Sequence, residues 1–190
     1  MTLSARIDYD CKSLRRYFER LFEVLAQELK EDQSAPVEAV DMTALESQAP
    51  YFRISHLLKP DMLIEVYSLV DFWLKPICDY HMTNGSLSLK HTDIKGNDDL
   101  HAYHKYLTQY VRLDLTSVKA SYERLQELRI VRNQFIHRGG HVPNDEKLIN
   151  RISAIKGIRL TLGSLIVIDE SFVWDVLDSA KNYLCTAAVK

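Results

Sequence analysis

The chain has 190 residues and a formal net charge of −2, with 46% hydrophobic and 26% charged residues. This composition is typical of a globular protein and excludes a disordered chain. A small negative net charge gives no global positive field that would attract nucleic acid, so any RNA contact must come from a local cluster of cations.

The spacing of the cysteines and the hydropathy further limit the class of protein that this sequence can encode. Cys11, Cys78 and Cys185 are far apart in the sequence and form no close-spaced pair. This argues against a disulfide framework and a structural zinc site, and favours reduced cysteines in the core. The most apolar stretch, residues 62–78, contains charged residues and is too polar for a membrane span. We therefore expect a cytoplasmic protein with no membrane association, no metal and no cofactor.

Residues 5–31 have the pattern of a long amphipathic helix, because their apolar residues recur at spacings of three and four. These apolar residues are Ile7, Cys11, Leu14, Phe18, Leu21 and Leu25. A polar loop is expected at residues 32–36, followed by a weaker helical stretch that ends at Pro50.

A second long helical region follows Pro50, and Pro60 is expected to restart or kink it. Residues 62–78 are apolar almost all the way round, apart from one narrow polar stripe. The stripe consists of Asp61, Glu65, Ser68, Asp71 and Lys75, at spacings of four, three, three and four. A helix of this kind is expected at the centre of a bundle.

Shorter elements are expected after this helix. The pairs Asn84-Gly85 and Gly96-Asn97 indicate turns, and the loop between them contains a short extended piece at residues 87–89. Residues 98–111 predict a short helix. Residues 117–138 predict a clear helix that stops at Gly139-Gly140.

The last part of the chain changes pattern. After a short helix at residues 145–154, the segments 158–162 and 165–169 predict a β-hairpin that turns at Gly163-Ser164. Asp169 or Ser171 is expected to cap a final helix.

The expected fold is therefore a single mainly α domain over residues 1–190. Four or more helices form a bundle over about residues 5–140, and a helix–hairpin–helix extension with a small C-terminal β-hairpin covers about residues 141–190.

The helix at residues 117–138 contains the most informative residue, Arg132. At 100° per residue, Arg132 projects into a broad apolar arc. The arc consists of Val118, Tyr122, Leu125, Leu128, Val131, Phe135 and Ile136. A guanidinium on an apolar face needs a carboxylate, a set of carbonyls or a bound anion such as phosphate. The alternative without a functional role is a structural ion pair of Arg132 with Asp71 or Glu65 of the central helix.

Asn133 and His137 are four residues apart and share one edge of this helix. Arg132 and His137 are five apart, so their directions diverge by roughly 140°. They converge only through the long Arg side chain, a loosened last turn, or a second copy of the helix in a dimer. The carbonyl end of the helix dipole favours an imidazolium at His137. A proton-carrying histidine beside a phosphate-binding arginine is a suitable acid/base pair for RNA cleavage.

Two other groups of residues carry side chains of the kinds that bind metals or nucleic-acid bases. His101 and His104 with Asp98 and Asp99 suggest a metal site, but they lack a third well-spaced ligand, and exposed helix polarity is favoured. The tyrosines Tyr103, Tyr106 and Tyr110 follow helical spacing, which favours core packing over a base-stacking platform.

The run from Glu127 to Gly140, with Arg132-Asn133 and His137, resembles the Arg-x4–6-His signature of the HEPN superfamily. In that signature the arginine is commonly followed by a polar residue, often Asn. The resemblance covers about residues 62–140, because the central helix, the turn near residues 93–96 and the helix that precedes the motif follow the usual HEPN order.

The resemblance implies a metal-independent endoribonuclease that acts as a homodimer, as in toxins and phage-defence effectors, with an antitoxin or regulatory protein as a further partner. By similarity, His137 is the acid/base for attack of the 2′-hydroxyl, Arg132 stabilises the scissile phosphate, and Asn133 orients one or the other. Asp71 and Arg129 are expected to support Arg132. Other HEPN domains are non-catalytic scaffolds or nucleotide- or RNA-binding modules, and this alternative stays open.

Overall fold

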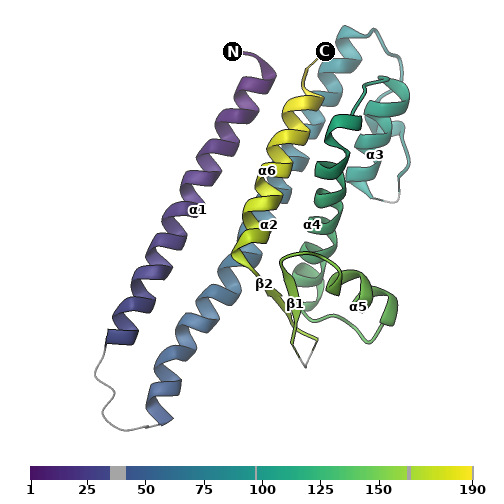
Figure 1. Cartoon of the computed structure of the whole chain (residues 1–190). Coiled ribbons are helices and arrows are strands. Elements are labelled where there is room, and N and C mark those ends of the chain that lie inside the picture. The colour runs from purple at the N-terminus through teal and green to yellow at the C-terminus, as the bar shows by residue number, and fades with distance from the viewer. Residues whose placement is uncertain (35–41, 97, 162–163, 190) are drawn as a thin grey trace.

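The computed structural model describes residues 1–34, 42–96, 98–161 and 164–189, which form six α-helices and one two-stranded sheet (Figure 1). The helices are α1 (Leu3–Ser34), α2 (Met42–Asn84), α3 (Asp99–Lys105), α4 (Lys119–Arg138), α5 (Glu146–Ser153) and α6 (Glu170–Ala187). The strands are β1 (Ile158–Leu160) and β2 (Ile166–Ile168). The expectation of a mainly α fold with a small hairpin before the last helix is confirmed. In the part of the chain described, no helix is long and apolar enough to cross a membrane.

Helix α6 lies inside the bundle and packs against α1, α2 and α4 (Figure 1). Its buried residues recur at spacings of one and three: Phe172, Val173, Val176, Leu177, Ala180, Tyr183, Leu184 and Ala187. Full burial of a side chain such as Phe, Val or Leu contributes about 1.5–3 kcal/mol, so this face holds much of the bundle together.

The predicted faces of α1 and α2 agree with the burial of their side chains. On α1, Ile7, Cys11, Phe18 and Leu25 are buried. On α2, every residue of the polar stripe is exposed. One difference is Phe72, which was expected among the apolar positions but is 62% exposed.

The helix end expected at Pro50 and the restart expected at Pro60 are wrong. The helix continues through Pro50, Pro60 and Pro76. Each proline removes one backbone hydrogen bond and crowds the preceding turn. After Pro60, however, α2 buries a nearly continuous set of apolar side chains in contact with α1, α4 and α6. Tertiary packing of this extent outweighs local propensity. The loop expected at residues 32–36 is also displaced, because α1 extends to Ser34, and the remainder lies outside the described residues.

The segment between α2 and α4 contains no strand among its described residues. The carbonyl of Leu89, expected in an extended piece, instead accepts a hydrogen bond from the Tyr106 hydroxyl at 3.0 Å. The helix expected at residues 98–111 consists of α3 followed by a π-helical turn, Tyr106–Tyr110. Asp98 caps α3 by accepting from the backbone N–H of His101.

The hairpin fixes the end of α4. Gly139 adopts the left-handed conformation with φ 59°, as expected for a helix-terminating glycine. The carbonyl of Gly140 accepts from Ile166 at 3.0 Å, and Val142 donates to Ser164 at 2.9 Å. The chain that leaves the last turn of α4 is therefore held against β2, whose residue Ile166 pairs with Leu160 of β1.

Candidate functional site

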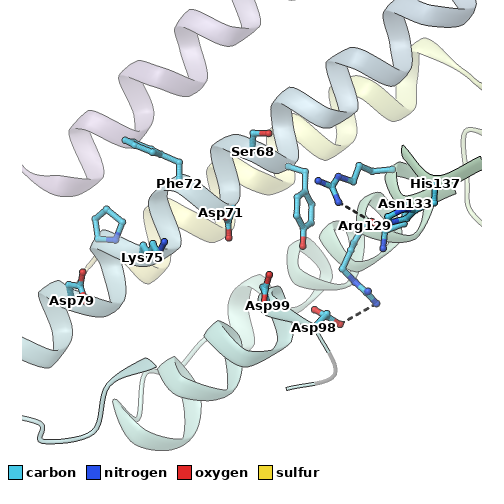
Figure 2. A pocket seen from close by; sticks show the side chains of 13 residues that line it. Ser68, Asp71, Phe72, Lys75, Asp79, Asp98, Asp99, Arg129, Asn133 and His137 are labelled. Atoms are coloured by element: carbon cyan, nitrogen blue, oxygen red, sulfur yellow. Dashed lines mark hydrogen bonds and ion pairs between the residues drawn. The ribbon is translucent and has the colours of Figure 1, made fainter. Parts of the chain in front are cut away.

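A cleft with a volume of about 790 Å³ lies between α2, the start of α3 and α4 (Figure 2). Its lining includes Tyr67, Ser68, Asp71, Phe72, Lys75, Asp79, Asp98, Asp99, Arg129, Arg132, Asn133 and His137. All five site residues expected from the sequence thus line one cleft. This volume lies within the range of ordinary ligand sites, about 300–1,000 Å³.

Arg132 is half-buried at one end of the cleft. Its Nη1 donates to the side-chain oxygen of Asn133 at 3.0 Å, and its guanidinium carbon lies 4.9 Å from the ring centroid of Tyr67. Its Nε is buried without a hydrogen-bond partner. Among the described residues no carboxylate lies within ion-pair distance of Arg132, so the alternative of a structural pair with Asp71 or Glu65 is not seen. A partly desolvated cation without a counterion favours a bound anion.

Arg129 lies one turn earlier on α4 and has a different environment. Its Nη2 lies 3.2 Å from Oδ2 of Asp98, and both side chains are largely buried. Its Nε donates to Gln126 at 3.1 Å. Arg129 is therefore neutralised by Asp98, whereas Arg132 keeps its full charge toward the cleft.

Tyr67 lies among these charges. Burial, with a smaller contribution from the carboxylate of Asp98, raises the pKa of its hydroxyl to about 12, while Arg129 and Arg132 oppose the shift. The phenol is therefore a neutral hydrogen-bond donor at physiological pH. Its ring also provides an aromatic face for the Arg132 guanidinium, a contact that stabilises the cation by about 0.5–2 kcal/mol.

His137 lines the same cleft from the last turn of α4 and is exposed. Within the described ranges its ring makes no hydrogen bond or ion pair that would occupy a nitrogen. The turn that carries it is closed by two backbone bonds, from Gly139 to Phe135 and from Gly140 to Gln134, each 3.1 Å. The imidazole is thus attached to a fixed backbone and open to a ligand.

The α2 side of the cleft is mixed in charge. Asp71 and Lys75 are exposed on the polar stripe, and the described part of the chain offers neither an ion-pair partner. Figure 2 shows Asp71 projecting from α2 toward Asp99 at the start of α3. Asp71 therefore shares the cleft with Arg132 without pairing with it, and Lys75 adds a second free cation that the sequence interpretation did not select.

The apolar arc expected on α4 is partly wrong. Ile136 is 44% exposed, while Ile130, outside the arc, is buried. Helix α4 contacts α2, α5 and α6, so more than one side of it is covered. Arg132 at the border of the buried face remains consistent with its expected position.

The two histidines of α3 are half-buried, which corrects the expectation that they are exposed. His101 Nδ1 lies 3.2 Å from the Tyr122 hydroxyl, and His104 Nδ1 lies 2.9 Å from the Tyr183 hydroxyl. The described residues contain no group of three or more His, Cys, Asp or Glu side chains arranged to hold a metal ion. Tyr103 and Tyr106 are buried as expected for core residues, whereas Tyr110 is 40% exposed, contrary to that expectation.

Sequence reasoning missed Tyr67, Lys75 and Asp98 as cleft residues. Lys75 and Asp71 are four apart on the polar stripe, a signal that could have found Lys75. Asp98 pairs with a residue 31 positions later, which periodicity cannot predict.

Comparison of the chain with family models, with curated proteins and with solved structures found no match. The functional argument therefore depends on the geometry of the cleft and on the chemistry of its side chains.

Proposed function

We propose that the cleft binds the scissile phosphate of RNA and that the protein is a metal-independent endoribonuclease of the HEPN type. The observation that carries the proposal is the half-buried guanidinium of Arg132, which has no carboxylate partner among the described residues and shares a cleft with the exposed His137. A phosphate oxygen would supply the missing counterion through charge-assisted hydrogen bonds.

In the proposed reaction, neutral His137 removes the proton of a ribose 2′-hydroxyl. The 2′-oxygen attacks the adjacent phosphorus, and the bond from phosphorus to the 5′-oxygen breaks. A protonated imidazole delivers a proton to the leaving 5′-oxygen, so the products are a 2′,3′-cyclic phosphate and a free 5′-hydroxyl. Arg132 neutralises the charge that develops on the phosphate oxygens. Asn133, whose amide oxygen holds Arg132, orients the guanidinium.

The need for two imidazoles favours a homodimer, in which a second copy supplies the second His137. A groove lined by Tyr17, Leu69 and Phe72 adjoins the cleft, since Ser68 and Phe72 line both. Tyr17 and Phe72 are 53% and 62% exposed. Exposed aromatic side chains are enriched at protein interfaces, so a second copy seated on this groove would lie beside the cleft.

Cleavage of a mixed RNA substrate by the purified protein in excess EDTA tests the proposal. We expect cleavage by the wild type, products with cyclic phosphate ends, and loss of cleavage in Arg132→Ala and His137→Ala. Arg138→Ala is a matched control, because Arg138 is exposed on the same turn and does not line the cleft. Folding of each variant is verified by circular dichroism.

Cleavage that requires a divalent cation, or that persists in both variants, contradicts the proposal. Well-folded dimeric wild type that cleaves no RNA supports the alternative of a non-catalytic RNA- or nucleotide-binding module. Sedimentation of Phe72→Asp tests the dimer separately, and we expect dissociation and loss of cleavage at the same protein concentration.

A further inference from the structure

A circuit of hydrogen bonds, completed by one ion pair, lies between the start of α3 and the middle of α4. We call it the polar ring; it consists of Asp98, His101, Tyr122, Gln126 and Arg129. Asp98 forms an ion pair with Nη2 of Arg129 at 3.2 Å and accepts a hydrogen bond from the His101 backbone N–H at 2.8 Å. Arg129 donates to Gln126 at 3.1 Å, Gln126 donates to Tyr122 at 3.0 Å, and the Tyr122 hydroxyl lies 3.2 Å from the His101 ring.

The donors and acceptors of the polar ring are consistent in direction. Arg129 can only donate, and Asp98 as a carboxylate can only accept. The Gln126 amide accepts from Arg129 through its oxygen and donates to Tyr122 through its nitrogen. The Tyr122 hydroxyl, which already accepts one bond, has its proton free for the Nδ1 of His101. Each link thus uses a different donor hydrogen, and no member competes with another.

Tyr122 connects the polar ring to the core. Its aromatic ring stacks on His104, with ring centroids 3.8 Å apart and planes at 16°. His104 in turn bonds the hydroxyl of Tyr183, a fully buried residue of α6. Burial lowers the pKa of His104, which favours the neutral imidazole that can accept from Tyr183. The position of the Tyr122 hydroxyl is therefore fixed by the core rather than by solvent.

Asp98 and Arg129 of the polar ring also line the cleft. There the polar ring determines which of two arginines is neutralised by a carboxylate. Arg129 and Arg132 are three residues apart on α4, so their side chains are neighbours on the helix surface. Asp98, Arg129 and Arg132 line the same cleft. Among the described residues, the ion pair of Asp98 is with Arg129. If Gln126 did not hold Arg129, Arg132 would be the other arginine of the cleft with which the Asp98 carboxylate could pair.

We propose that Tyr122 is a positioning residue that, through Gln126, holds Arg129 on Asp98 and so keeps Arg132 free for the phosphate of the substrate. The inference rests on the proposed function, because it gives Arg132 the role of phosphate ligand. It adds that Arg129 neutralises Asp98 and does not itself bind the substrate phosphate.

Nitrogen-15 NMR of the arginine side chains tests the proposal with Tyr122→Phe, which removes one hydroxyl and keeps the ring that stacks on His104. Two readouts are measured: solvent exchange of the Arg129 Nε–H, and the affinity of Arg132 for inorganic phosphate. We expect exchange to rise and phosphate affinity to fall, each about fivefold, for the loss of one hydrogen bond. Asp98→Asn combined with Tyr122→Phe is expected to restore the phosphate affinity, because the competing carboxylate is gone.

Tyr9→Phe is the matched control, since Tyr9 is 63% exposed on α1 and its hydroxyl makes no hydrogen bond among the described residues. If Tyr122→Phe does not fold, Gln126→Leu interrupts the same circuit from the other side. Unchanged exchange at Arg129 overturns the positioning role, and so does faster exchange with unchanged phosphate affinity. Failure of the proposed function gives a different result. In that case phosphate leaves the Arg132 signal of the wild type unchanged, while the Arg129 Nε–H stays protected from solvent exchange. The polar ring then has a structural role only.

Discussion

Helix α4 carries two groups of polar side chains that differ in how their hydrogen bonds are satisfied. Toward its N-terminal half, Tyr122, Gln126 and Arg129 belong to a closed circuit with α3. Toward its C-terminal end, Arg132 has a buried Nε without a partner, and His137 is open to the cleft. Both groups lie on one helix of the same bundle, so exposure to solvent alone does not explain the difference in their hydrogen bonding.

This difference separates structure from function. A satisfied polar network contributes to the stability of one conformation, because breaking it leaves buried groups without partners. An unsatisfied cation lowers stability until a ligand supplies its counterion, and such exceptions to local consistency are expected at functional sites. The comparison predicts that changes in the first group alter folding most, and changes in the second alter activity most.

The largest effect is expected for His137→Ala. Loss of the general acid/base is expected to lower RNA cleavage by about 10²–10⁴-fold. Because the side chain is exposed, the free energy of unfolding should change by less than about 0.5 kcal/mol. Cleavage kinetics and urea denaturation measure the two quantities. His141→Ala, an exposed histidine beyond Gly140 that does not line the cleft, should leave cleavage unchanged.

Glycine substitutions at the end of α4 test whether the fixed conformation of its last turn contributes to stability. An alanine Cβ at Gly140, with φ 87°, would lie 2.5 Å from the Phe135 ring, whereas Gly139, with φ 59°, has open space. We expect Gly140→Ala to destabilise by about 3 kcal/mol, from left-handed strain plus overlap, and Gly139→Ala by about 1 kcal/mol. Thermal unfolding compares the pair. Equal losses of stability in the two variants would show that the overlap with Phe135 is relieved without a free-energy cost.

Tyr183→Phe tests the buried contact behind the first group, because the Tyr183 hydroxyl bonds His104, on which Tyr122 stacks. The variant removes the hydroxyl that bonds His104 in a buried environment, and we expect a loss of about 1–2 kcal/mol of unfolding free energy. Guanidinium denaturation of this variant beside Tyr9→Phe measures the loss against an exposed tyrosine. A change no larger than that of Tyr9→Phe would contradict a structural role for this hydrogen bond.

The smallest effect is the contribution of His104 to the pH dependence of stability. Burial lowers its pKa in the folded protein, and the neighbouring His101 lowers it further. The unfolded chain therefore binds more protons just below its own pKa of about 6.5. The stabilisation is fully present above that pH and is lost as pH falls through the lower pKa of the folded state. His104→Phe should reduce the slope of stability against pH below about 6.5. An unchanged slope would show that other groups cause the pH dependence.

Local signals in the sequence were sufficient for most of the fold. The Gly139-Gly140 stop, the pairing of β1 with β2 and the apolar face of α1 depend on neighbouring residues and are confirmed. The helix end expected at Pro50 and the restart expected at Pro60 are wrong. After Pro60, packing against other helices outweighs the local effect of proline.

The candidate site was predictable in part. Arg132 on an apolar arc and His137 in the last turn follow from spacing on one helix. The pair of Asp98 with Arg129 and the contact of His101 with Tyr122 join residues 31 and 21 positions apart, and only the packing of α3 on α4 brings them together. Periodicity places a residue on a face but does not say which side chain on another helix will neutralise it.

The central claim is that Arg132 is available to a phosphate and Arg129 is not. Binding of a non-cleavable 2′-O-methyl oligoribonucleotide to wild type, Arg132→Gln and Arg129→Gln tests it most directly. Loss of a charge-assisted contact at Arg132 is expected to weaken binding by about tenfold or more, while Arg129→Gln weakens it by only a fewfold through the released Asp98 carboxylate. Equal losses in the two variants, or a greater loss in Arg129→Gln, would contradict the account.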